Sequence, residues 1–136
     1  LELLIYVEGT ELEYIQRFAD LQLTAVQELR NSCSILALEY PMTALGAVTV
    51  TAELDIPWIL SARDTEYDVF KEQLRTALDS GASGFMAIEQ LLPPLPNTGN
   101  AVFNQTEMVE FCKTIGRDRI LELARIASEA GEKAHS

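Results

Sequence analysis

Side chains that can do acid–base or ion-binding chemistry occur near the ends of four short apolar segments. They are Glu2, Tyr6, Glu8, Glu39, Ser61, Arg63 and Glu89. Two carboxylates held close together can act as general acid and base or bind a hard cation. Arg63 is expected to pair with Glu89 or Glu39, and binding of a substrate anion is its alternative role. For any single one of these residues, a strand end that simply meets solvent is the plainer explanation.

Several other kinds of active site are excluded by the residues of this sequence. The only histidine is His135, near the end of the sequence, so nucleophile activation by histidine and histidine-ligated metal sites are not expected. No glycine-rich nucleotide-binding motif occurs. Schiff-base chemistry requires a lysine whose pKa is lowered at a buried site. Lys71, Lys113 and Lys133 fall in helix-like segments or in the tail, so none is expected to reach the strand ends.

The apolar segments alternate with helix-like segments, which is the pattern of βα units and a parallel sheet. We predict strands at residues 1–8, 33–41, 56–62 and 83–89, and helices at 9–31, 42–54, 64–81, 106–116 and 117–133. Residues 91–105 contain three prolines and no periodicity, so an irregular loop is predicted there. Residues 133–136 are predicted to form a frayed tail. The whole chain, 1–136, is predicted to be a single domain.

The segment 64–81 has the clearest helical pattern in the chain. Asp64 or Thr65 can cap its first turn, and Gly81 is expected to end it. Its predicted apolar stripe consists of Phe70, Leu74, Ala77 and Leu78.

Two α/β architectures fit these elements: half of a TIM (β/α)₈ barrel, and an open doubly wound sheet. Each predicted strand has one apolar face suited to helices and a second face that becomes polar toward its carboxyl end. In a barrel that second face points into the lumen, and its carboxyl end forms the mouth. We expect Glu89 on this face, beside Ser61 and Arg63. The barrel explains the charges better, and its two free edges are expected to be covered.

The composition narrows the choice of partners. The formal net charge is −11 in 136 residues, which argues against nucleic acid and anionic membrane surfaces as partners. Cys33 and Cys112 are too few for a disulfide framework, so free thiols in a cytoplasmic protein are expected. No secretory signal and no apolar segment of membrane-spanning length is found.

Four segments resemble consecutive strand motifs of the tagatose 1,6-bisphosphate aldolase family. These segments are LELLIYVE, LALEYP, PWILSA and GASGFMA. The family consists of class I, Schiff-base aldolases with a TIM barrel, and sulfofructose-phosphate aldolases are its relatives. Its L-E-(I/P)-L strand carries a glutamate that acts in proton transfer, which corresponds to Glu2. Its W/Y-x-x-L-S-A-G motif carries a serine that helps to hold phosphate, which corresponds to Ser61. The resemblance implies the C-terminal half of the barrel, from its fifth strand to its eighth helix.

The departures from the family motifs fall on the chemistry. The family's D-V-L-K-V-E-x-P strand corresponds to SILALEYP, so its Schiff-base lysine corresponds to Ala37, while the glutamate is kept as Glu39. Its G-A-x-G-(F/V)-L-x-G-R motif corresponds to GASGFMAIE, so Ile88 and Glu89 replace the phosphate-binding Gly-Arg pair. Arg63 stands where the family has glycine.

The resemblance therefore implies a degenerate or partial aldolase-family barrel with a role in binding or assembly. The alternative is a lyase that cleaves a ketose bisphosphate into dihydroxyacetone phosphate and an aldehyde, with the missing groups supplied by an N-terminal half or by a metal ion. No cofactor is expected in the leading hypothesis. The expected partners are a small carbohydrate and either a second copy or an N-terminal half-barrel.

Overall fold

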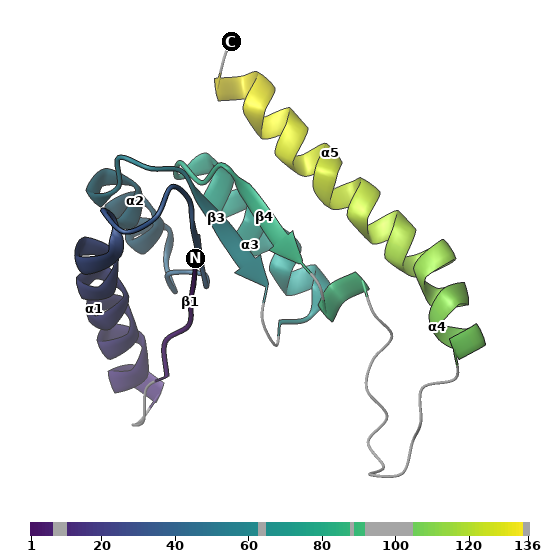
Figure 1. Ribbon diagram of the computed structural model, residues 1–136, viewed down its shortest axis with the longest axis horizontal. Helices are drawn as coiled ribbons and strands as arrows, with labels where there is room; N and C mark the ends of the chain where they lie inside the picture. Colours follow the sequence, from purple (N-terminus) through teal and green to yellow (C-terminus); the bar gives the residue numbers. More distant parts are fainter. Residues whose placement is uncertain (7–10, 63–64, 88, 92–104, 135–136) are drawn as a thin grey trace.

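The computed structural model describes residues 1–6, 11–62, 65–87, 89–91 and 105–134. Its centre is a four-stranded sheet whose strands lie in chain order (Figure 1). The strands are β1 (Glu2–Leu3), β2 (Leu36–Leu38), β3 (Trp58–Ala62) and β4 (Gly84–Ala87). Every pairing between neighbouring strands is parallel. The predicted α/β class with a parallel sheet is confirmed.

The first two strands are shorter than the predicted segments because other contacts replace the backbone ladder. After β1, the backbone N–H of Ile5 donates to the Oε2 atom of Glu39 at 3.0 Å, and not to a backbone carbonyl of the next strand. After β2, the chain turns at Pro41, which has no N–H to donate, and at Met42, whose φ is 67°. The glutamate carboxylate therefore marks the point where these two strands separate.

Three helices connect the strands: α1 (Glu11–Leu29), α2 (Ala44–Glu53) and α3 (Tyr67–Asp79). The short helix α2 forms despite its β-branched residues because local hydrogen bonds support it. The Thr43 hydroxyl oxygen accepts a hydrogen bond from the N–H of Gly46 at 2.9 Å and so caps the first turn. Thr49 and Thr51 donate their hydroxyl protons to carbonyls four residues earlier.

The predicted cap of α3 is wrong, whereas its predicted stripe and end are confirmed. Glu66 occupies the N-cap position and makes no side-chain capping hydrogen bond, with Thr65 one residue earlier; Asp64 lies outside the described residues. Burial along α3 follows the predicted stripe, with Phe70, Leu74 and Ala77 fully buried and Leu78 packed against the core. Gly81 ends the helix with a φ of 112°, a conformation that side chains rarely adopt.

The C-terminal part is one continuous helical run where two helices were predicted. It comprises α4 (Gln105–Phe111), a π-helical turn η2 (Cys112–Gly116) and α5 (Arg117–Ala134). A Cβ atom at Gly116 would lie 2.8 Å from the carbonyl oxygen of Leu91, in the short 3₁₀ helix η1 (Glu89–Leu91). The run passes this carbonyl without breaking because Gly116 has no side chain. The predicted loop 91–105 lies almost entirely outside the described residues. α5 continues to Ala134, into the predicted tail.

The core lies on one face of the sheet. Its fully or largely buried members are Leu36, Leu38, Trp58, Leu60, Ala62 and Ala87 from the strands and Val26, Ala47, Val50, Phe70, Leu74, Ala77, Leu123 and Ile126 from α1, α2, α3 and α5. In Figure 1, α3 lies behind β3 and β4. The strand residues between these core members point to the opposite face, which we call the second face. It consists of Glu2, Ala37, Ile59, Ser61, Gly84 and Met86.

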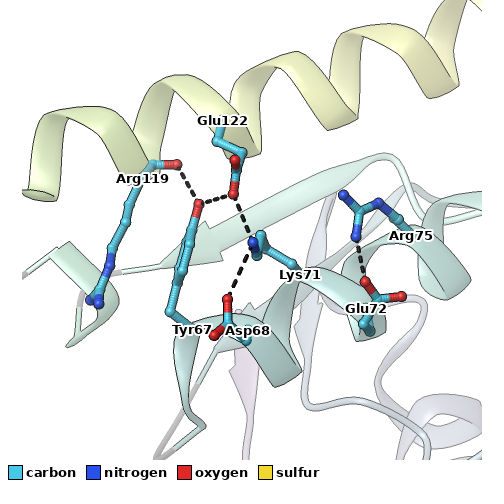
Figure 2. A network of polar contacts seen from close by, with 7 residues as sticks. All are labelled: Tyr67, Asp68, Lys71, Glu72, Arg75, Arg119 and Glu122. Carbon is cyan, nitrogen blue, oxygen red and sulfur yellow. Dashed lines mark hydrogen bonds and ion pairs between the residues drawn. The ribbon is translucent and has the colours of Figure 1, made fainter.

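A polar network that we call the α3–α5 clamp joins these two helices (Figure 2). The Tyr67 hydroxyl donates to Oε1 of Glu122 at 2.7 Å. Lys71 Nζ lies 3.0 Å from the same carboxylate oxygen and 3.2 Å from Oδ1 of Asp68. The guanidinium carbon of Arg119 lies 4.7 Å from the centre of the Tyr67 ring, and its Nη1 donates to the backbone oxygen of Gln90 at 2.8 Å. The clamp thus fixes α5 to α3 and to η1.

The clamp shifts the pKa values of three of its members. Hydrogen bonds from Tyr67 and then Lys71 hold the pKa of Glu122 below its ordinary value of 4.5. The hydrogen bond with Glu122, followed by that with Asp68, raises the pKa of Lys71 above 10.5. Burial, followed by the hydrogen bond to Glu122, raises the pKa of Tyr67 above 10.0. The ionised carboxylate, the ammonium and the neutral phenol are therefore the forms that the fold favours.

Within the described part of the chain, no helix combines the length and the apolar character needed to cross a bilayer.

Candidate functional site

The structure brings three of the predicted site residues together on the second face of the sheet. Glu2 on β1 is in register with Ala37 on β2, and Ala37 is in register with Ile59 on β3, two residues before Ser61. The Ser61 hydroxyl donates to Oε1 of Glu2 at 2.5 Å, within the range of a hydrogen bond from a hydroxyl to a carboxylate. Since β2 lies between β1 and β3, this bond crosses β2 diagonally, on the face that carries Ala37. A methyl side chain there leaves room for it.

Burial agrees with this arrangement. Ala37 is 7% exposed and Ser61 is 5% exposed, although both lie on the face that carries no member of the core. Glu2 is exposed. The carboxylate therefore meets solvent while its serine partner is enclosed. Chemically, this places a proton acceptor in a fixed position on the sheet, without an amine beside it among the described residues of this face.

Glu39 follows β2 and is held by two other elements. Its carboxylate accepts the N–H of Ile5, and its backbone oxygen accepts a hydrogen bond from Nε2 of Gln22 on α1 at 2.9 Å. Glu39 thus joins the end of β1 to α1. These contacts give it a structural role, beside the role in substrate binding expected from its position.

Gln22 was missed by the sequence analysis. It is 1% exposed, and its Oε1 atom is buried without a hydrogen-bond partner. The signal was available, because Phe18, Gln22 and Val26 follow one another at four-residue spacing and are all buried. An amide in an apolar helical stripe points to a buried polar contact, which here is the backbone of Glu39.

In the described structure, the other predicted site residues are not seen beside Glu2, Ala37 and Ser61. Arg63 and Glu8 lie outside the described residues, as does any pairing of Arg63 with Glu39 or Glu89. Tyr6 is 75% exposed. β4 ends at Ala87, and Phe85 and Ala87 point to the core face, in register with Leu60 and Ala62. The strand alternation that placed Glu89 beside Ser61 is therefore wrong, because Phe85 and Ala87 are helix-facing and Glu89 already belongs to η1.

The three lysines lie in helical segments, as predicted. Lys71 belongs to the α3–α5 clamp, and Lys113 is exposed in η2. Lys133 lies in the last turn of α5. His135 lies outside the described residues. Cys33 and Cys112 are free thiols, as predicted.

Two features of the described residues bear on ligand binding. No group of three or more His, Cys, Asp or Glu side chains in this part of the chain is arranged to hold a metal ion. An open groove of about 420 Å³ lies between Tyr40 and the outer side of α3, away from Glu2 and Ser61. It is lined by Tyr40, Asp68, Val69, Glu72, Gln73 and Thr76.

Comparison of the chain with models of known protein families finds no match, and comparison with curated proteins finds no significant similarity.

Proposed function

We propose that this chain is a four-unit half-barrel of the aldolase type whose imine-forming site is filled, and that it acts through binding or assembly. The observation that carries the proposal is the hydrogen bond from Ser61 to Glu2 over Ala37. By resemblance, position 37 is the place of a Schiff-base lysine. In this chain a serine–glutamate hydrogen bond crosses the face of β2 that carries this position, which supports a filled site.

The order of the strands supports a barrel half over a doubly wound sheet. A doubly wound sheet reverses its strand order at a switch point and carries helices on both faces. Here the four strands lie in chain order, and the core members from α1, α2, α3 and α5 pack with one face. Consecutive units of a (β/α)₈ barrel have this arrangement.

The charges around position 37 support the loss of aldol chemistry. Imine formation needs a neutral amine. Lys71, the lysine nearest in sequence to the strands, forms ion pairs with Glu122 and Asp68, which raise its pKa and keep it charged. Glu2 and Glu39 would also repel a phosphorylated substrate. A small uncharged carbohydrate fits this face better than a sugar phosphate.

The two outer strands support the proposed role in assembly. β1 and β4 each have one neighbour, so each presents one edge of backbone groups without a strand partner in the described structure. Four more parallel strands would close an eight-stranded barrel. A second copy or another half-barrel can supply them.

Borohydride reduction with dihydroxyacetone phosphate, followed by intact mass measurement, tests the chemical part. We expect no covalent adduct on the unmodified chain, while a class I aldolase treated in parallel gains one. Ala37→Lys alone is expected not to restore efficient cleavage, because nearby carboxylates keep the new amine protonated. A stoichiometric adduct on the unmodified chain would contradict the proposal and favour the lyase alternative.

Hydrogen exchange tests the assembly part. In the assembled state we expect slowed amide exchange in residues 1–5 and 84–87, which form or flank the two edges. Exchange in both segments at the rate of an unstructured peptide, at every protein concentration, would argue that the edges stay uncovered.

A further inference from the structure

The hydrogen bond between Ser61 and Glu2 has the stagger of a barrel layer. Glu2 is in register with Ala37, and Ala37 is in register with Ile59, so Ser61 lies two residues beyond the position that is level with Glu2. In a (β/α)₈ barrel the strands tilt, and a shear of about eight over eight strands shifts the level by about one residue per strand. Over two strands the shift is about two residues. Glu2 and Ser61 therefore lie as two members of one barrel layer do, and we call this the Glu2–Ser61 layer.

The Glu2–Ser61 layer is incomplete in the described structure. A layer of a (β/α)₈ barrel holds about four side chains, which alternate strands supply. β1 supplies Glu2 and β3 supplies Ser61, so the other members have to come from the corresponding strands of another half-barrel. By the same stagger, β2 and β4 supply Ala37 and Met86 to a second layer. Both layers are open on the side where the other half-barrel would lie.

The carboxylate of Glu2 determines what another half-barrel has to supply to this layer. Its Oε1 atom accepts the Ser61 proton, whereas its Oε2 atom has no partner among the described residues. Glu2 is exposed, and closing a barrel over it would remove water from the carboxylate. A carboxylate that loses its water needs a charged partner, because an unpaired buried charge is strongly destabilising. The described residues of the second face include no lysine or arginine.

We propose, on the basis of the proposed function, that the partner of this chain is a different half-barrel that contributes a lysine or arginine side chain to the Glu2–Ser61 layer. A second copy would contribute a second Glu2 to the layer, so two carboxylates would share the lumen without a counter-charge between them. A basic side chain from a different half-barrel forms an ion pair with Glu2 instead. The partner is therefore selected by charge in the lumen as well as by pairing along the strand edges.

A charge-reversed copy of the chain provides a partner of this kind, and sedimentation velocity measures its association. Glu2→Lys mixed with the unmodified chain should associate at least about tenfold more tightly than either protein alone, because a lysine then lies in the same layer as the carboxylate. Glu13→Lys is the matched control, since Glu13 is exposed on α1 and the substitution changes the net charge equally. Its mixture with the unmodified chain should associate no more tightly than the unmodified chain alone.

Neutralising Glu2 gives a second variant that keeps the size of the side chain. Glu2→Gln retains an oxygen that can accept the Ser61 proton. It should self-associate about tenfold more tightly than the unmodified chain, because its layer holds no like charges. Glu13→Gln is its control and should behave as the unmodified chain does. Arg63 lies outside the described residues, so a series with Arg63→Gln in every chain tests it as a counter-charge, and the order of affinities should persist.

Three results would overturn the proposal of a basic partner. They are equal association of the Glu2→Lys and Glu13→Lys mixtures, an unmodified chain that self-associates as tightly as the Glu2→Lys mixture, and loss of the order of affinities in the Arg63→Gln series. Self-association of the unmodified chain with slowed exchange in residues 84–87 would keep the proposed assembly through strand edges and overturn only the basic partner. A borohydride adduct on the unmodified chain would contradict the proposed function instead, so the two proposals fail separately.

Discussion

Tyr67 and Glu122 are joined by a 2.7 Å hydrogen bond between residues that lie 55 positions apart in the sequence. The bond ties the first turn of α3 to α5, whose fully or largely buried apolar residues are Leu123 and Ile126. The position of α5 therefore depends on polar contacts as well as on apolar burial.

Removing the phenolic hydroxyl should loosen this attachment. Tyr67→Phe keeps the ring and its contact with Arg119 but leaves Glu122 with one hydrogen bond fewer. We expect the free energy of unfolding to fall by about 1 kcal/mol, as for a partly exposed hydrogen bond to a charged group. Urea denaturation measures it. Tyr40→Phe is the control, because the described structure shows no hydrogen bond from the Tyr40 hydroxyl, and it should change stability by much less.

The clamp also predicts how stability responds to acid. The pKa of Glu122 is lower in the folded chain than its ordinary 4.5, so its contribution is fully present above pH 4.5 and is lost as the pH falls through the folded value. Glu122→Gln should flatten this part of the stability–pH curve, measured by urea denaturation at a series of pH values. The exposed pair of Arg125 and Glu129 provides the control, since Glu129→Gln should leave the acid slope nearly as it is. Parallel curves for Glu122→Gln and the unmodified chain would show that the lowered pKa does not stabilise the fold.

Two glycines should respond to alanine in opposite directions. Gly81 has a φ of 112°, and a Cβ atom there would lie 2.4 Å from Cγ2 of Thr51. Gly81→Ala should cost about 1–3 kcal/mol through backbone strain and the clash. Gly131 lies in α5 with nothing within 4 Å of an added Cβ, so Gly131→Ala should stabilise by about 0.5–1 kcal/mol. Thermal unfolding distinguishes these signs, and equal shifts in one direction would contradict the structure.

The hydrogen bond over Ala37 can be tested by a double-mutant cycle. Ser61→Ala should cost about 1 kcal/mol in the unmodified chain, because it removes a buried hydroxyl that donates to a carboxylate. In an Ala37→Leu background, the larger side chain stands between Glu2 and Ser61, so Ser61→Ala should cost almost nothing more. Additive effects would mean that the contact does not pass over position 37.

Helices and strands were predictable from the sequence where each depends on its own residues. The stripe of α3, the glycine at its end and the positions of all four strands follow from local periodicity and turn residues. The end of β1 was not predictable in this way, because it depends on the Glu39 carboxylate reaching the N–H of Ile5. The π-helical turn depends on Leu91, far from it in sequence, and no local pattern reports that contact.

The candidate site was predictable only in part for the same reason. Alternation along single strands placed Glu2, Ala37 and Ser61 on one face correctly. It failed for Glu89, because β4 ends before that residue. The α3–α5 clamp unites residues from two helices that the sequence pattern treats as separate, so its polar members could be read only as solvent-facing charges.

The chain order of the strands has a consequence for how this protein emerges from the ribosome. Each strand pairs with the strand of the preceding βα unit, Leu36 with Trp58 and Ile59 with Gly84, so no pairing waits for a distant segment to be synthesised. When β2, β3 or β4 is synthesised, the strand with which it pairs has already been made. Vectorial synthesis and native topology therefore run in the same direction, because β2, β3 and β4 each cover one edge of the strand made before them.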